Sequence, residues 1–254
     1  FTGSTEVGKK IARAIASTDK KATLELGGKG ANIVFDDAPV DEAVEGIVNG
    51  IFFNQGHVCC AGSRLILQES IAEEVIEKLK VRMSKIRVGD PLDKNTDLGA
   101  INSKEQLVKI KELSAVGDVE GAQRWSPQCN LPDTGFWFAP TIFTGVTQAN
   151  RIAQEEIFGP VLSILPFENE AEAISIANNS IYGLAASVWT ANLSRAHRVA
   201  DALHSGTVSV NTVDALGMNI PFGGFKHSGF GRDLSLHAMD KYTGLKTTWI
   251  RYEN

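Results

Sequence analysis

The chain has 254 residues, of which 43% are hydrophobic and 22% are charged, and its formal net charge is −5. This composition is typical of a globular chain with a substantial core, and the length suits one large domain or two small ones. The negative charge and the lack of a basic run argue against nucleic acid or an anionic membrane as a partner. The short, interrupted apolar stretches argue against a membrane span.

The apolar pattern predicts alternating strands and helices. A turn at 2–6 leads into a helix, with a small hydroxyl residue at the expected cap. The other expected helices are at about 40–53, 71–86, 103–113, 170–182 and 193–203, and the expected strands are at 31–35, 65–67, 161–165, 184–189 and 207–211. Residues 117–141 show only a weak, loop-rich pattern. This alternation predicts an α/β fold with a mainly parallel sheet.

Two adjacent cysteines, Cys59 and Cys60, lie on a glycine-bracketed loop between a predicted helix and a predicted strand. A thiol on such a loop can meet a ligand. The thiolate is the reactive form, so a site using this sulfur needs backbone N–H dipoles or a nearby base. The alternative to a reactive thiol is that both cysteines are small hydrophobic residues buried in the core.

Glu25 lies between two leucines and is followed by two glycines, which predicts a strand that ends in a tight turn and projects a carboxylate. Partial burial would raise its pKa toward neutrality and suit it to act as a general base. An ion-paired strand residue is an equal alternative. Together, Glu25 and Cys59 would support covalent catalysis, in which the cysteine attacks and the glutamate later activates water.

Three cysteines, two of them adjacent, do not form a disulfide framework. A reducing compartment is the simpler interpretation, and it predicts a cytoplasmic protein. We assign no metal site and no function to Cys129.

Five motifs resemble the NAD(P)-dependent aldehyde dehydrogenase superfamily, and they occur in that family's order along the whole chain. They are FTGSTEVG at 1–8, LELGGK at 24–29, FNQG at 53–56 leading to Cys59, EEIFGPV at 155–161 and PFGG at 221–224. Relatives are markedly longer and their extra residues come first, so the chain resembles a C-terminal half. The implied parts are the end of the cofactor domain at 1–27, the catalytic domain at 28–227, and a return segment with an oligomerisation strand at 228–254.

The resemblance implies a role for each matched position. Cys59 is the nucleophile and Glu25 the general base, while His57 is read as a loop residue near the pocket mouth. Phe222 is a wall of the aldehyde tunnel, beside an access loop at 212–220. The implied cofactor-binding residues are Gly3 and Ser4 at the pyrophosphate, Leu26, Gln106 near the nicotinamide ribose, Glu156 at the ribose hydroxyls, and Phe158 at the nicotinamide face. The alternatives are a plain capped helix for 3–4, a solvated glutamine for Gln106, and ordinary packing for 212–222.

The implied cofactor is NAD, with NADP not excluded, because the adenosine-binding strands would precede residue 1. The substrate is an aldehyde, and the C-terminal segment looks closest to bacterial aminoaldehyde dehydrogenases. Many relatives have, at the position of Asp233, a glutamate that relays protons toward the general base. Because the side chain of Asp233 is shorter, the sequence does not establish such a relay in this chain. A strand at 242–250 would join a sheet between subunits and predicts a homodimer or homotetramer. The competing hypotheses are a non-catalytic subunit and a cofactor-free esterase.

Overall fold

The computed structural model describes residues 1–213 and 215–253. Residue 214, inside the predicted access loop, lies outside the described residues. The helices are α1 (Thr5–Ile15), α2 (Val40–Phe52), α3 (Ala72–Met83), α4 (Lys104–Val119), α5 (Arg151–Gln154), α6 (Glu170–Asn178) and α7 (Leu193–Ala202), with 3-10 segments η1 (Phe53–Gly56), η2 (Glu69–Ile71) and η3 (Leu236–Lys241). The strands are β1 (Leu24–Glu25), β2 (Ala31–Val34), β3 (Arg64–Gln68), β4 (Gln123–Trp125), β5 (Thr141–Thr144), β6 (Val161–Phe167), β7 (Tyr182–Gly183), β8 (Ala185–Trp189), β9 (Thr207–Val210), β10 (Phe225–Lys226) and β11 (Gly229–Phe230).

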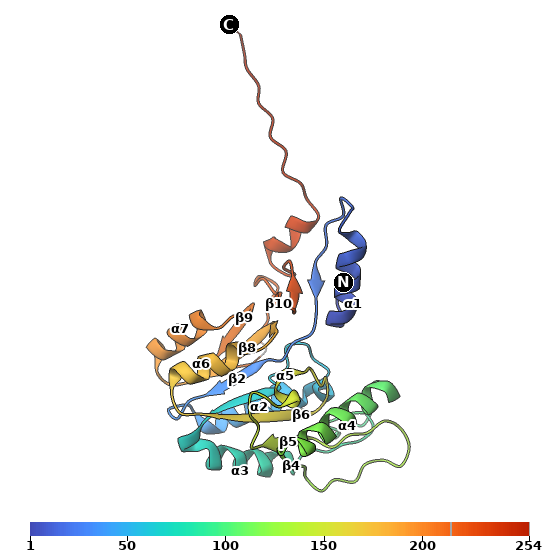
Figure 1. The fold of residues 1–254 in the computed structure, drawn as a ribbon, viewed down its shortest axis with the longest axis vertical. Coiled ribbons are helices and arrows are strands. Elements are labelled where there is room, and N and C mark those ends of the chain that lie inside the picture. Colours follow the sequence, from blue (N-terminus) through green and yellow to red (C-terminus); the bar gives the residue numbers. More distant parts are fainter. Residues whose placement is uncertain (214, 254) are drawn as a thin grey trace.

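Seven of the described strands form one sheet in the order β4-β5-β6-β3-β2-β8-β9 (Figure 1). Neighbouring strands are parallel except for β4, which runs antiparallel to β5. The predicted α/β fold with a mainly parallel sheet is therefore confirmed.

The sheet is buried on both faces, as parallel sheets generally are. Successive residues of a strand point to opposite faces, so Ile33 packs with α4, α6 and α7, whereas Val34 packs with α2 and α3. None of the helices in the described part of the chain has the length and apolarity that a membrane crossing would need.

The loops before β2, β3 and β6 meet at the amino-terminal edge of the sheet, because these three strands are adjacent and parallel. Those loops carry Gly27–Gly30, Cys59–Ser63 and Glu155–Pro160. Open parallel sheets usually bind ligands at the carboxyl ends of their strands. In this chain the motifs predicted to be functional lie at the opposite edge.

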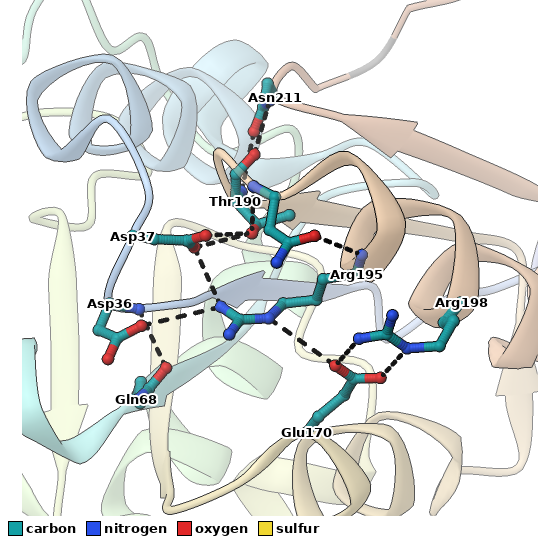
Figure 2. A network of polar contacts seen from close by, with 9 residues as sticks. Asp36, Asp37, Gln68, Glu170, Thr190, Arg195, Arg198 and Asn211 are labelled. Carbon is teal, nitrogen blue, oxygen red and sulfur yellow. Dashed lines mark hydrogen bonds and ion pairs between the residues drawn. The ribbon is translucent and has the colours of Figure 1, made fainter.

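A polar network occupies the carboxyl-terminal edge of the sheet instead (Figure 2). Arg195 of α7 lies 3.1 Å from Asp37 and 3.7 Å from both Asp36 and Glu170. The Thr190 hydroxyl donates to Asp37 at 2.7 Å. Arg195 therefore links the end of β2 to α6 and α7, and Thr190 at the end of β8 joins the network through Asp37.

The first and last parts of the chain lie side by side, away from the main sheet (Figure 1). β1 pairs antiparallel with β11, with Leu24 opposite Phe230 and Glu25 opposite Gly229. The Ser4 hydroxyl accepts the Val7 N–H at 3.3 Å, so the predicted hydroxyl cap of α1 is confirmed. The predicted division into parts at 1–27, 28–227 and 228–254 stays a prediction.

The predicted strand at 242–250 is wrong for this chain on its own. Residues 242–253 contain no strand and leave the domain as an extended tail (Figure 1). A β-strand needs a neighbour that accepts and donates its backbone hydrogen bonds, and no described segment lies beside this tail as a partner. An alternating pattern cannot say where the partner strand comes from.

Residues 117–141, whose sequence pattern predicted mainly loops, also contain regular secondary structure. Helix α4 runs to Val119, six residues beyond the predicted end, and β4 follows. Gly117 is buried inside α4, where an added Cβ would lie 2.9 Å from Ile152 and 3.1 Å from Phe143. This glycine is needed for helix packing, although in the sequence it looks like a helix terminator.

Candidate active site

Glu25 ends β1, and its backbone is held opposite Gly229. The residue is 5% exposed, and neither carboxylate oxygen has a hydrogen-bond partner in the described part of the chain. Burial raises the pKa of Glu25 to about 7, and the negative charge of Asp233 adds to the increase. The expected pKa elevation is confirmed. A carboxylate with this pKa and no fixed partner can take a proton from water near neutral pH.

Cys59 lies close to the turn that follows Glu25. An added Cβ at Gly28 would lie 2.2 Å from the Cys59 carbonyl oxygen, so only glycine allows this approach. A hydrogen bond with the Cys60 thiol lowers the pKa of Cys59 below its ordinary value. Burial and the carboxylates of Glu156 and Glu25 act in the opposite direction. The net decrease favours the thiolate, which is the nucleophilic form.

The loop before Cys59 has an unusual backbone. Asn54, Gln55 and Gly56 all have left-handed conformations, with φ of 50°, 57° and 70°. Side-chain hydrogen bonds support this turn: the Asn54 amide donates to the His57 carbonyl at 3.1 Å, and Gln55 Oε1 accepts the Gly99 N–H at 2.9 Å. The cysteine therefore follows a tightly braced turn rather than a free loop.

Glu25 and Cys59 both line one cavity of about 520 Å³. Nine residues singled out from the sequence meet there: Gly3, Ser4, Glu25, Leu26, His57, Cys59, Gln106, Glu156 and Phe158. They come from the turn before α1, from β1 and the residue after it, from the cysteine loop, from α4 and from the loop before β6, up to 155 residues apart in sequence. One cavity therefore holds a thiol, a buried carboxylate with a raised pKa and a second carboxylate.

Glu156 is anchored at the wall of this cavity. Its Oε1 accepts the Gly28 N–H at 2.8 Å, and an added Cβ at Gly27 would lie 2.5 Å from its Oε2. Burial raises the pKa of Glu156, while the Gly28 hydrogen bond opposes that increase. The carboxylate is thus fixed in place at the cavity, with Gly27 making room for it and Gly28 donating a hydrogen bond to it.

The family model of the aldehyde dehydrogenase family matches residues 1–248. The chain belongs to this family. The resemblance of the five motifs is confirmed.

The aldehyde dehydrogenase chain spans about half the length of the curated relatives it matches. It is 47% identical to an aldehyde dehydrogenase of Emericella nidulans, over 99% of this chain and 51% of that protein. It is 45% identical to betaine aldehyde dehydrogenase 1 of Rhizobium meliloti, over 98% of this chain and 52% of that protein.

Solved aldehyde dehydrogenase structures have the same fold. Pseudomonas syringae AldA, an indole-3-acetaldehyde dehydrogenase described in complex with NAD+ and IAA, has a TM-score of 0.96 and 48% identity, covering 99% of this chain and 52% of that one. An NAD+ complex from Bacillus cereus has a TM-score of 0.96 and 42% identity, covering 100% of this chain and 52% of that one.

Within this aldehyde dehydrogenase chain, Gln106 has partners that the sequence did not indicate. Its side-chain Nε2 donates to the carbonyl oxygens of Ile157 at 2.8 Å and Phe158 at 2.9 Å. Both amide hydrogens are therefore used to hold the loop before β6. Gln106 lines the cavity as predicted, but neither N–H remains for a ribose hydroxyl.

Phe222 is not part of the 520 Å³ cavity. It lines a separate cavity of about 10 Å³, together with Cys60, Thr207 and Leu216. The two adjacent cysteines thus face different spaces, and Cys59 is the one beside the predicted cofactor residues. This placement distinguishes the two thiols, which the sequence alone could not do.

Asp233 lies near enough to Glu25 to act on its charge. Its backbone forms a bridge with Phe222, and its carboxylate accepts a hydrogen bond from Lys241. The shorter side chain is therefore held by a lysine. The relay role that the sequence left open stays a prediction.

Some cavity residues were not found from the sequence. Thr2, Asn54, Val58 and Lys109 line the same cavity. Lys109 lies three residues after Gln106 on α4, on the same helix face, so helical spacing was a usable signal. Thr2 and Asn54 lie within the motifs at 1–8 and 53–56, but nothing in those motifs indicates that they reach the cavity, because loop and turn geometry brings them there.

Proposed function

We propose that this chain carries the nucleophile, the general base and the nicotinamide end of the cofactor site of an NAD-dependent aldehyde dehydrogenase, which oxidises an aldehyde to a carboxylic acid. The observation that supports this most is the shared cavity of Cys59, Glu25, Glu156 and Phe158. Each chemical role needs its side chain within reach of one bound substrate, and a single cavity provides that.

Cys59 is the proposed nucleophile. Its lowered pKa increases the thiolate fraction, and the thiolate adds to the aldehyde carbon to form a tetrahedral thiohemiacetal. The negative oxygen of this adduct needs hydrogen-bond donors where the charge develops. The backbone N–H of Cys59 is proposed as one donor. In the family the other is an asparagine that would precede residue 1.

The cavity residues suit the nicotinamide end of the cofactor. Gly3 and Ser4 lie at the N-terminus of α1, which favours phosphate. The anchored Glu156 can accept ribose hydroxyls, and Phe158 can cover an aromatic ring. A bound nicotinamide would supply the hydride acceptor, and loss of the hydride from the thiohemiacetal would leave Cys59 in a thioester. NAD is supported by the related NAD+ complexes, and NADP is not excluded.

Glu25 is proposed to complete the reaction. With a pKa of about 7 it is partly ionised at neutral pH, and both its oxygens lack protein partners among the described residues. It takes a proton from water as the water oxygen attacks the thioester carbon. The carbon–sulfur bond then breaks, releasing the carboxylic acid and the Cys59 thiolate.

We propose an aldehyde as the substrate and no narrower class. The curated relative named for betaine aldehyde and the structural relative named for indole-3-acetaldehyde are 45% and 48% identical to this chain. Because these two sequence identities are so similar, they do not indicate whether the aldehyde substrate carries a cationic or an aromatic group. The aminoaldehyde stays a prediction from the C-terminal sequence, as does a reducing, cytoplasmic location.

We also propose that the tail at 242–253 forms a strand against a second copy of the chain. Trp249 is 90% exposed and Tyr252 is 85% exposed, an unusual position for large aromatic side chains. Light scattering on the chain with and without residues 242–254 tests this proposal. We expect a dimer or tetramer to become monomeric when the tail is removed, and an unchanged mass would contradict it.

The function is tested by aldehyde-dependent NADH formation, with an aliphatic and an amino aldehyde and Cys59→Ser as the control. Ester hydrolysis without NAD reports on the thiol alone. NADH formation that the mutation abolishes supports the dehydrogenase. Ester hydrolysis alone indicates a competent thiol with an incomplete cofactor site, and neither activity favours the non-catalytic subunit.

A further inference from the structure

The ring of His57 is stacked on the ring of Phe158, with centroids 5.4 Å apart and planes 8° from parallel. Both side chains line the cavity that contains Cys59 and Glu156. Offset parallel rings at this separation attract each other. The stack connects the loop that carries the proposed nucleophile to the loop that carries the proposed nicotinamide contact.

The backbone around Phe158 is strained and closely held. Phe158 has a left-handed conformation with φ of 55°, which is unfavourable for a bulky side chain. Gln106 holds the Phe158 carbonyl, and the next residue, Gly159, has its carbonyl so close to Gly56 that an added Cβ there would lie 2.2 Å away. These contacts fix the backbone on both sides but not the rotation of the ring.

His57 is suited to orient that ring without adding charge. Burial lowers the pKa of His57, so the imidazole is neutral near pH 7. Its Nε2 is buried and has no hydrogen-bond partner in the described part of the chain. A neutral imidazole packs as an aromatic ring and does not repel a positively charged nicotinamide ring nearby.

We propose that His57 is a positioning residue, whose ring stack holds Phe158 in the orientation that receives the nicotinamide beside Cys59. This inference rests on the proposed function. It assigns the stack to cofactor binding, because the nicotinamide contact is proposed for Phe158, whereas the thiol chemistry is proposed for Cys59 and Glu25. Cofactor affinity should therefore depend on the ring at position 57, while thiol chemistry should not.

The test compares His57→Ala, which removes the ring, with His57→Phe, which keeps an aromatic ring, and with His197→Ala, an exposed histidine of α7. We measure the KM for NAD+ in NADH formation, the affinity for nicotinamide mononucleotide by calorimetry, and p-nitrophenyl acetate hydrolysis without NAD. His57→Ala should weaken both nicotinamide readouts about threefold to tenfold, the effect of one aromatic pair. Ester hydrolysis should stay within about twofold in all variants, and His57→Phe should behave like the wild type.

Three results would overturn the inference. Unchanged nicotinamide readouts in His57→Ala would remove the role. Equal loss in His57→Phe and His57→Ala would show that stacking is not the cause. A parallel loss of ester hydrolysis would show a structural role for the loop. If the wild type forms no NADH but binds the mononucleotide, the proposed function fails. The positioning role is then tested by comparing the mononucleotide affinities of the wild type and the His57 variants. If it binds neither, both fail.

Discussion

Gly28 and Cys59 are in backbone contact: an added Cβ at Gly28 would lie 2.2 Å from the carbonyl oxygen of Cys59. The same glycine donates its N–H to Glu156 at 2.8 Å. Gly28 therefore holds the loop after Glu25 close to both the cysteine loop and the Glu156 carboxylate at the cavity wall.

Gly28→Ala is expected to damage both folding and catalysis. A methyl group cannot fit 2.2 Å from a backbone oxygen, so the cysteine loop must move. We expect a loss of about 1–3 kcal/mol in the free energy of unfolding and at least a tenfold decrease in ester hydrolysis. Gly50→Ala is the control, since the nearest atom to its Cβ position, on Val213, lies 3.5 Å away, which is an ordinary van der Waals contact. Urea unfolding and hydrolysis rates check this, and a wild-type-like Gly28→Ala variant would contradict it.

The pH dependence of turnover should follow Glu25. Because the base acts when ionised, the deacylation rate should rise with pH through about 7. Glu25→Gln should remove this rise while Cys59 still becomes acylated, so a burst without steady turnover is expected. Rapid-mixing measurements of p-nitrophenyl acetate hydrolysis from pH 5.5 to 9 check this. A pH profile that Glu25→Gln leaves unchanged would exclude Glu25 as the base.

The same pKa shift predicts a change in stability. The folded-state pKa of Glu25 is raised above its ordinary value, so its stabilising contribution is present below pH 4.5 and is lost as the pH rises through about 7. Glu25→Gln cannot ionise and should be more stable than the wild type at pH 8, by about 1–3 kcal/mol. Urea unfolding at pH 5 and pH 8 measures the difference. Equal stability differences at the two pH values would argue against a buried, titrating Glu25.

The two cysteines should respond differently to substitution. Cys59→Ser should lower ester hydrolysis by at least a hundredfold. Cys60→Ala removes the hydrogen bond that lowers the pKa of Cys59, so alkylation of Cys59 by iodoacetamide should shift to higher pH. The alkylation rate as a function of pH, with the modified residue identified by mass spectrometry, checks both. Loss of hydrolysis in Cys60→Ala with retention in Cys59→Ser would reverse the assignment.

Arg195 should matter for stability and not for chemistry. Its guanidinium lies 4.5 Å over the ring of Phe35, and its side chain is 24% exposed. Arg195→Met leaves the carboxylates of Asp36 and Asp37 without this partner and should cost about 1–3 kcal/mol. Arg198→Met, at a side chain that is 57% exposed, should cost less than about 1 kcal/mol. Urea unfolding ranks the two, while ester hydrolysis per folded molecule should be unchanged in both.

The chain's own pattern was sufficient for the α/β fold, the parallel sheet, the cap of α1, and the proposal of a thiol paired with Glu25, but it did not separate Cys59 from Cys60. These features depend on local periodicity, on short motifs and on residue chemistry, all of which are visible along a single chain. The elevated pKa of Glu25 was also predictable, because an acid between leucines is expected to be buried.

Other features were decided only by the tertiary structure. Gln106 is used to hold the loop before β6, the 10 Å³ cavity separates Phe222 and Cys60 from Cys59, and His57 lies on Phe158. Each of these features joins residues about 50 to 160 positions apart. The sequence pattern indicates which face of a helix or strand a residue lies on, but it does not indicate which distant residue packs against it. The tail at 242–253 is the reverse case: its pattern is that of a strand, but a strand exists only when a second strand supplies its hydrogen bonds.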